Sequence, residues 1–377
     1  MTPQIPLFKI YSDENDVEAI NRIIKSGMYW AIGSEISIFE QKIAEYIGTR
    51  HCTVFNSGTS ALHAIMIAHD IQKDDEVIVP SLTFIATANA PLFVQGKPVF
   101  ADIEPSTLGL DPEDVKEKIT SKTKAIIPVH YGGCPAQIHA LKDIAEDHDL
   151  LLIEDAAESF GSKLNGQMIG TFGQSAMLSF CQNKIITTGE GGAIVTNSKD
   201  VYDKLLLVRS HGRKDDKSYF SDPFSSNYVN LGYNFRLSNI NAALGLTQLE
   251  KVELIISKRL RVANHYIDKL KNQNRIILPS TPPNGRHVFQ LFSIRVKNGF
   301  RNELIDFLKL NGISSKVYFY PVHSTPFYKE KLKYNINLPV TELVSQEILS
   351  LPIYPTMTED EQNYVIEKII EFYEIKI

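Results

Sequence analysis

Short β-rich runs alternate with amphipathic stretches from about residue 50 to residue 200, and this order constrains the fold of the 377-residue chain more than any other feature. The alternation is typical of βαβ units, in which consecutive strands lie in one sheet between layers of helices. The candidate strands are 52–55, 76–80, 97–103, 124–130, 150–157, 175–180 and 191–197. We therefore expect an α/β protein with a mixed, mostly parallel main sheet between helices.

The sequence changes character after a long helical pattern that begins beyond Ser238, its expected N-cap. A proline-rich stretch at 274–285 ends this pattern. The rest of the chain predicts a strand, a helix, a strand and a last helix opened by a capping box of Thr358 with Glu361, and the first three span 288–296, 301–310 and 313–320. We place a domain boundary inside the long helix. It separates a large domain (1–250) from a small C-terminal α+β domain (251–377).

The composition excludes several classes of function. Lys and Arg number 39 against 44 Asp and Glu, so the formal net charge is -5 and a nucleic-acid surface is not expected. Cys52, Cys134 and Cys181 match no zinc-ligand spacing, so we expect reduced thiols and no metal. The N-terminal segment lacks a basic start with an apolar core, and no apolar run approaches the roughly 18 residues of a membrane span. We therefore expect a cytoplasmic protein with no membrane partner.

Two polar segments follow apolar strands at the edge where open α/β sheets bind ligands. NSGTS at 56–60 lies between a strand and a helix, where backbone N–H groups and the helix dipole suit a phosphate group. An ordinary helix cap is the alternative interpretation. Asp155 ends an apolar strand in IEDAAES, and a carboxylate there needs a positive partner such as a protonated pyridine nitrogen. A structural ion pair or a helix cap is the alternative for Asp155.

Lys184 lies in the loop CQNKIITTGE between two candidate strands. Most lysines are solvated on the surface, and that is the alternative interpretation. In this loop Ser179 and Asn183 supply polar donors nearby, and several glycines after the lysine let the backbone turn tightly back into a strand. A partly desolvated lysine can lose its proton and attack an aldehyde, which is how Schiff-base lysines arise.

A phosphate turn, a carboxylate on a strand and a lysine on a loop are the three contacts that pyridoxal 5′-phosphate (PLP) needs, because this cofactor presents a phosphate, a ring nitrogen and an aldehyde. From about residue 6 to the last helix, the chain resembles the DegT/DnrJ type of nucleotide-sugar aminotransferases. The blocks that carry the resemblance are NSGTSALHA, EVIVPSLTFIATANA, AIIPVHYGG, IEDAAESFG, LSFCQNKIITTGEGGAIVTN, GYNFRLSNINAALG and YFYPVH. The resemblance implies the aspartate-aminotransferase-like fold of type I, with PLP in the large domain.

The resemblance also implies roles for individual residues. Lys184 would hold PLP as a Schiff base and move the proton during catalysis, and Asp155 would face the pyridine nitrogen. The other cofactor contacts would be Gly58, Thr59 and Ser179 at the phosphate, Phe84 on the ring, Glu158 near the ring hydroxyl, Asn183 beside the lysine, and Asn234 at the phosphate of the neighbouring subunit's cofactor. The last contact implies a homodimer with shared active sites. The family often has Gln at the position of Glu158, and usually His, Tyr or Phe at that of Cys181.

Substrate contacts are implied for Tyr29 and Trp30 in one turn and for Tyr318 and His323 in YFYPVH, with core packing as the alternative for Tyr318. Two further histidines, at 130 and 211, are expected to be structural. In the implied reaction, glutamate gives its amino group and leaves as 2-oxoglutarate, and a nucleotide-linked keto-sugar then takes the amine for surface polysaccharide or glycan biosynthesis. The blocks EDAAES, GYNFRLSN and NKIITTGEGG favour amination at carbon 4, as in the perosamine-synthase kind.

Three alternatives remain open at this point. One is a transaminase of the same fold that makes 3-amino sugars. Another is a PLP-dependent sugar dehydratase, but such relatives carry His where this chain has Lys184. The third is a non-catalytic PLP-binding regulatory protein, and the negative net charge and the lack of an appended DNA-binding segment argue against it.

Overall fold

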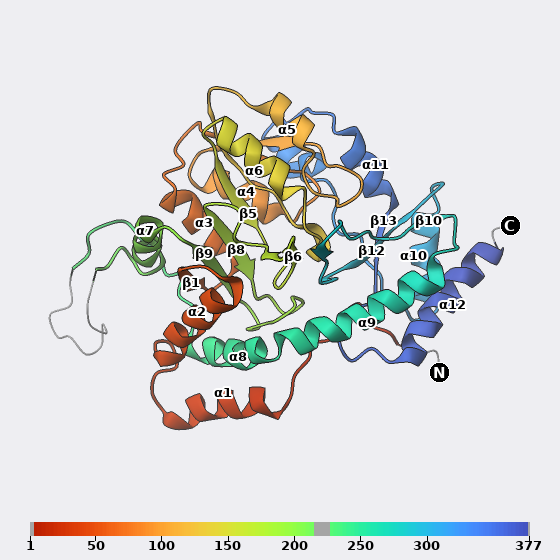
Figure 1. Ribbon diagram of the computed structural model, residues 1–377, viewed down its shortest axis with the longest axis horizontal. Coiled ribbons are helices and arrows are strands. Elements are labelled where there is room, and N and C mark those ends of the chain that lie inside the picture. The colour runs from red at the N-terminus through yellow and green to blue at the C-terminus, as the bar shows by residue number, and fades with distance from the viewer. Residues whose placement is uncertain (1–3, 215–226, 376–377) are drawn as a thin grey trace.

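A seven-stranded sheet lies at the centre of the computed structural model, which describes residues 4–214 and 227–375 (Figure 1). In spatial order its strands are β1 (His51–Phe55), β9 (Gly192–Thr196), β8 (Ser175–Ser179), β5 (Leu151–Asp155), β4 (Thr123–Ile126), β2 (Glu76–Pro80) and β3 (Lys97–Ala101). Neighbouring strands from β8 to β3 are parallel, whereas β9 is antiparallel to both β1 and β8. The prediction of a mixed, mostly parallel sheet is confirmed.

Helices cover both faces of this sheet, because successive strand residues point to opposite faces and are apolar on both. In β5, for example, Leu152 lies in one hydrophobic core and Ile153 in the other. The first core is covered by α2 (Ser34–Ile47), α5 (Pro112–Lys118), α6 (Ile138–Asp147) and α8 (Asn239–Glu250); the second is covered by α3 (Gly58–Ala68), α4 (Ile85–Phe93) and α7 (Lys199–Arg209). Outside this sandwich, α1 (Glu14–Ser26) packs against α8.

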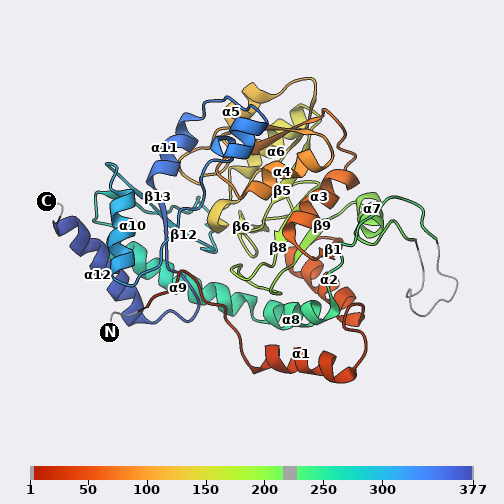
Figure 2. The same ribbon diagram turned by 180° about the vertical axis from the view of Figure 1, so that it is seen from behind.

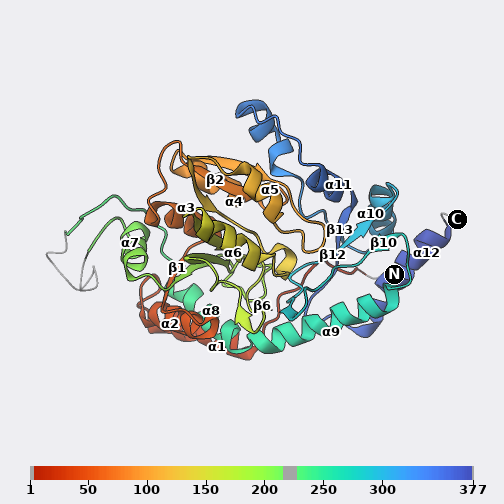
Figure 3. The same ribbon diagram turned by 45° about the horizontal axis from the view of Figure 1, so that its top comes forward.

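The helix α9 (Val252–Leu270) leads from the main sheet to a third hydrophobic core (Figure 3). This core lies between a small antiparallel sheet and helices (Figure 2). In the sheet, β12 (Phe292–Val296) lies between β10 (Ile276–Ile277) and β13 (Ile348–Leu351). Among the helices, α12 (Glu359–Ile375) packs against α9, and α10 (Arg301–Leu310) packs against α12. Ile5 also belongs to this core. Its N–H donates a hydrogen bond to the Gly312 carbonyl, and its carbonyl accepts one from Ser314 N, both at 2.9 Å. The division of the chain into domains near residue 250 stays a prediction.

Two smaller elements join these regions. A three-stranded sheet places β6 (Lys163–Leu164) between β7 (Gln167–Met168) and β11 (Gly285–Arg286). The helix α11 (Pro339–Glu347) is anchored to the main sheet by Asp102, whose carboxylate accepts hydrogen bonds from the N–H groups of Val340 and Thr341 at 2.9 and 2.8 Å.

Local start signals were predicted correctly, and three longer segments were not. The capping box is present, because Thr358 N donates to Glu361 Oε2 at 2.9 Å and Glu361 N donates to Thr358 Oγ1 at 3.1 Å. The expected strand at 313–320 is wrong: only isolated bridges occur there. The strand predicted for 288–296 begins at Phe292. The long helix is two helices that meet at Lys251.

In residues 4–214 and 227–375, no helix is both long and apolar enough to cross a membrane. Nor does this part of the chain bring together three or more His, Cys, Asp or Glu side chains that could hold a metal ion. All three thiols are free, with Cys52 and Cys134 buried and Cys181 half-buried.

Candidate active site

The NSGTS turn forms the N-terminal end of α3 at the edge of the main sheet. Ser57 is the N-cap and accepts a hydrogen bond from Ser60 N at 3.0 Å, while Gly58 begins the helix with Thr59 exposed beside it. A Cβ atom on Gly192 would lie only 2.6 Å from Gly58 N, so β9 and the turn approach as closely as two glycines allow. The N–H groups in the first turn of a helix have no helical partners, so this helix N-terminus suits a phosphate group.

The hydroxyl of Ser179, at the end of β8, lies beside this turn. A Cβ atom on Gly58 would be 3.5 Å from Ser179 Oγ. The structure therefore brings Gly58, Thr59 and Ser179 together, as the sequence predicts for a phosphate site.

Asp155 ends β5 as a buried carboxylate that is bound by neutral donors. Its Oδ2 accepts a hydrogen bond from Thr87 Oγ1 at 2.7 Å, and its Oδ1 accepts one from Ala157 N at 3.2 Å. Burial raises the pKa of Asp155 above its ordinary value of 3.8, although these hydrogen bonds and the charge of Lys184 oppose the shift. A buried carboxylate in this state is stabilised when a protonated ligand atom faces it.

Lys184 forms an ion pair with Glu158, and its side chain is 14% exposed. The distance from Lys184 Nζ to Glu158 Oε1 is 3.3 Å, and the other oxygen of Glu158 accepts a hydrogen bond from Gly132 N at 2.8 Å. The amine thus lies among carboxylates, with Glu158 in contact and Asp155 near enough for its pKa to respond to the lysine charge. This arrangement keeps a single amine in a fixed place at the carboxyl edge of the sheet.

Tyr318 contacts Asn183, the residue directly before Lys184 in the lysine loop. Burial and the charge of Glu158 raise the pKa of Tyr318, and a hydrogen bond from Asn183 opposes that rise. The Asn183 carbonyl accepts a hydrogen bond from Gln290 Nε2. The predicted substrate residue Tyr318 is therefore next to the lysine site.

The other predicted aromatic residues are exposed. Phe84 precedes α4, is 59% exposed, and lies 6.2 Å from the Phe319 ring between centroids. Tyr29 and Trp30 are exposed in the turn between α1 and α2, where the Trp30 carbonyl accepts a hydrogen bond from Ile240 N at 3.2 Å. In the described part of one chain, no polar or ring contact joins these two residues to Lys184.

His323 and Asn234 contact parts of the fold that flank the site. The His323 ring is buried, with Nδ1 2.7 Å from Ser81 Oγ and Nε2 3.5 Å from a Glu342 oxygen. Burial lowers the pKa of His323. The Asn234 carbonyl accepts a hydrogen bond from Asn56 Nδ2 at 3.3 Å, which places Asn234 beside the NSGTS turn of its own chain.

Comparison with known proteins shows the family. The model of the DegT/DnrJ/EryC1/StrS aminotransferase family matches residues 11–370. The chain belongs to this family. It is 36% identical over 374 residues to GDP-perosamine synthase of Escherichia coli O157:H7, with 99% of each chain covered. It is 37% identical over 368 residues to GDP-perosamine synthase of Caulobacter vibrioides, with 97% of each chain covered.

A solved structure similar to this chain contains a bound cofactor, PMP. NtdA from Bacillus subtilis with bound cofactor PMP is 29% identical, with a TM-score of 0.88 over 98% of this chain and 85% of that chain. Aminotransferases of the DegT/DnrJ/EryC1/StrS family depend on PLP, and this chain is one of them. Its residues fit the cofactor. The α3 turn suits the phosphate, Asp155 is a buried carboxylate without a cation in contact, and Lys184 presents an amine near it.

Several residues of this family member's site were not predicted. Thr87 binds Asp155 and is itself 2.9 Å from Thr83 through their hydroxyl oxygens. Thr87 lies in the first turn of α4 and Thr83 just before its N-cap, and no local sequence pattern marks their contact with Asp155. Arg259 is buried and donates to the carbonyls of Phe289 and Gln290 at 3.0 and 2.7 Å. No sequence signal marks that contact, since α9 and the segment before β12 are separate in sequence.

Proposed function

We propose that this PLP-dependent sugar aminotransferase moves an amino group from glutamate to carbon 4 of a nucleotide-linked keto-deoxysugar. The observation that carries the proposal is the buried Asp155 close to the Lys184–Glu158 ion pair at the carboxyl edge of the sheet. Identity over nearly the whole chain to two GDP-perosamine synthases supports carbon 4 and favours GDP as the nucleotide. The presence of Lys184 argues against a dehydratase.

Each half of the reaction needs a proton to leave one atom and arrive at another. When bound, PLP supplies an aldehyde that links to amines and a ring that accepts an electron pair. Lys184 Nζ would take the proton from the substrate carbon as general base and return it as general acid. Asp155 would hold a proton on the ring nitrogen, and its buried position would strengthen that interaction because the local dielectric constant is low.

The remaining residues bind and orient. Gly58, Thr59 and Ser179 would hold the phosphate through N–H and hydroxyl groups, and Phe84 would cover the ring. Glu158 would lie near the hydroxyl group of the cofactor ring, and Tyr318 would border the space where the sugar enters. We further propose a cytoplasmic homodimer in which Asn234 completes the phosphate site of the partner, and a role in making amino sugars for polysaccharides or glycans.

The test is a pair of half-reactions on the purified protein. Adding glutamate should convert the absorbance of the bound cofactor from the aldehyde form to the amine form, and 2-oxoglutarate should appear in equal amount. The amine form is then mixed with GDP-, UDP- and dTDP-linked 3-keto and 4-keto sugars. Return of the original spectrum with a GDP-linked 4-keto sugar, and a 4-amino product by NMR, is the expected result. Amination of a 3-keto sugar alone would overturn the assignment of carbon 4.

A further inference from the structure

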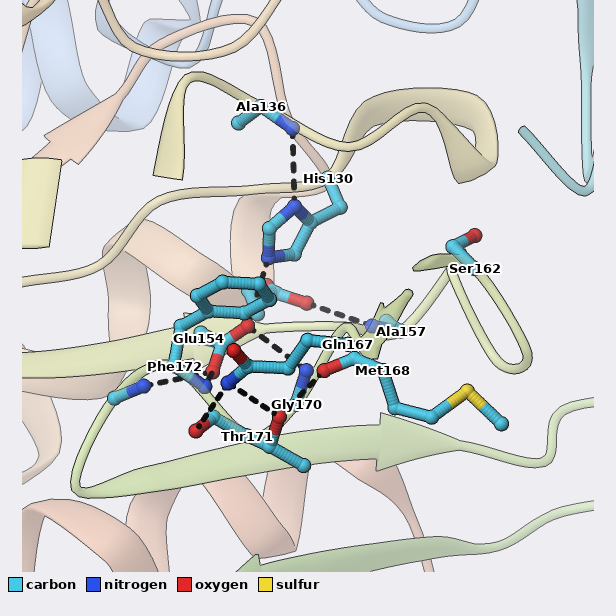
Figure 4. Close-up of polar contacts among 12 residues, drawn as sticks. His130, Ala136, Glu154, Ala157, Ser162, Gln167, Met168, Gly170, Thr171 and Phe172 are labelled. Carbon is cyan, nitrogen blue, oxygen red and sulfur yellow. Dashed lines mark hydrogen bonds and ion pairs between the residues drawn. The ribbon is translucent and has the colours of Figure 1, made fainter. Parts of the chain in front are cut away.

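A buried carboxylate lies on the opposite face of β5 from Asp155. Glu154 is 0% exposed, and its two oxygens accept hydrogen bonds from three backbone N–H groups of the turn at 170–173, at 2.7 to 2.9 Å (Figure 4). Its Oε2 is also 3.2 Å from Nε2 of His130. Four donors therefore surround this carboxylate, which is the condition for burying a charge without a large loss of stability.

The contacts of His130 fix its tautomer. Its Nδ1 accepts a hydrogen bond from Ala136 N at 3.1 Å, so that nitrogen carries no proton (Figure 4). The proton is then on Nε2, which donates to Glu154. The ring, itself 0% exposed, holds the beginning of the segment 130–136 against its end.

This closed segment carries the N–H group that holds Glu158. Gly132 adopts a φ of 60°, and its N–H donates to Glu158 Oε2 at 2.8 Å. The other oxygen of Glu158 is the partner of Lys184, at 3.3 Å. A continuous series of contacts thus runs from Glu154 through His130 and Gly132 to Glu158 and Lys184.

We propose that His130 and Glu154 are positioning residues for Lys184, acting through the segment 130–136 and Glu158. Neither residue touches the amine, so their effect is on its place and not on the chemistry. If His130 Nδ1 no longer accepts from Ala136, the segment loses the side-chain contact that joins its two ends. We expect Gly132 N to shift and its hydrogen bond to Glu158 to weaken. A carboxylate held at one point can rotate, and the amine then spends less time where the cofactor aldehyde arrives. The inference rests on the proposed role of Lys184.

Two substitutions of the histidine separate its two contacts. In His130→Asn the amide oxygen replaces Nδ1 and can still accept from Ala136, whereas in His130→Gln the amide nitrogen replaces Nε2 and can still donate to Glu154. Protein freed of cofactor is mixed with PLP, sampled over time, and reduced with borohydride, and the Lys184 peptide is measured by mass spectrometry. His130→Gln should slow attachment about tenfold or more, since small misplacements of reacting groups have effects of this size. His130→Asn should remain within about threefold of the natural protein by the same argument.

Glu154→Gln gives the same test without changing the histidine. We expect the amide nitrogen to take the place of Oε2. Oε2 accepts from one backbone N–H group and the histidine, whereas Oε1 accepts from two backbone N–H groups, from which an amide nitrogen could not accept. The amide nitrogen would then donate to His130 Nε2 and move the ring proton to Nδ1, against the Ala136 N–H. Attachment should slow as much as in His130→Gln. This variant also keeps the inference testable if His130→Gln does not fold.

A double-mutant cycle distinguishes positioning from general loss of stability. In a Glu158→Ala background the path to Lys184 is already cut, so adding His130→Gln should change the attachment rate no further. Equal slowing in both backgrounds, or slowing of both His130 variants in step with their melting temperatures, would overturn the inference. If the natural protein forms no borohydride-stable link at Lys184, the proposed function itself fails.

Discussion

The hydroxyl of Thr87, in α4, donates a 2.7 Å hydrogen bond to the carboxylate of Asp155, at the end of β5. This contact joins two elements that are separated by 68 positions in the sequence. It orients the carboxylate, which no cation contacts within residues 4–214 and 227–375, and burial raises its pKa. The site is thus strained electrostatically until a protonated group faces Asp155.

Replacing Asp155 with Ala should cost far more activity than cofactor affinity. Without the carboxylate, the protonated form of the ring nitrogen is no longer stabilised, whereas the phosphate contacts at Gly58 and Ser179 remain. We expect turnover to fall by about a hundredfold or more, the usual effect of removing one preorganised electrostatic group. PLP affinity, measured by fluorescence titration, should change by only a few-fold. Near-normal turnover would mean that another group faces the nitrogen.

Asp155→Asn should stabilise the cofactor-free protein at neutral pH. Because the folded protein has a raised pKa at Asp155, this residue contributes stability that is fully present below pH 3.8 and is lost as the pH rises through the folded value. The amide has no such loss. In urea unfolding between pH 4 and pH 7, the free energy of unfolding of Asp155→Asn should therefore increase relative to that of the natural protein as the pH rises.

Asp268→Asn is the matched control for this pH dependence. A hydrogen bond from Lys271 lowers the pKa of Asp268, so this carboxylate contributes stability above its ordinary pKa and loses it as the pH falls. At neutral pH, Asp268→Asn should have a lower free energy of unfolding than the natural protein, whereas Asp155→Asn should have a higher one. The same sign in both variants would contradict the assignment for Asp155.

Lys184→Ala should leave a folded protein that holds PLP without a covalent bond. The change removes one amine from a loop and no core side chain, so the melting temperature should stay within a few degrees. Borohydride reduction followed by mass spectrometry should find no labelled peptide, and turnover should be absent. Lys199→Ala, on the surface of α7, is the control and should behave like the natural protein. If borohydride reduction fixes PLP to a peptide of the Lys184 variant, another lysine carries the cofactor.

Gly192→Ala should weaken cofactor binding through the phosphate. The added methyl group would lie 2.6 to 2.7 Å from backbone atoms of Ser57 and Gly58, so the turn must move. We expect the Kd for PLP to rise about tenfold or more, equivalent to about 1.4 kcal/mol. Pyridoxal, which lacks the phosphate, is the control ligand, and its weaker binding should change little. Equal losses for both ligands would point to a disturbance of the whole site.

The features that sequence predicted best depend on neighbours along the chain. Ser238 caps α8, and Thr358 with Glu361 opens α12. The expected strand at 313–320 failed because pairing depends on distant partners: Ile313 bridges to Ile5 and Lys316 bridges to Ser350, and no continuous ladder forms.

The break at Lys251 has the same kind of cause. The helical pattern runs through it, but the Lys251 ammonium contacts the carboxylates of Asp13 and Asp16 near the start of α1. In the site, Gly58, Ser179 and Lys184 were predicted from motifs. Thr87 was not, because its role depends on a partner that no local pattern reveals.

The last prediction concerns whether two chains share each site. Asn234 lies beside the NSGTS turn of its own chain through Asn56, while the GYNFR block implies that its side chain serves the partner's cofactor. Lys184→Ala and Asn234→Asp should each be inactive alone, the latter because a negative charge would face the phosphate. In a mixed isologous dimer one site then receives both defects and the other receives none. Random exchange makes half of the dimers mixed, so activity should return to about a quarter of the natural level. If Asn234 serves its own chain, each site of the mixed dimer keeps one defect, and mixing restores no activity although native mass spectrometry shows mixed dimers.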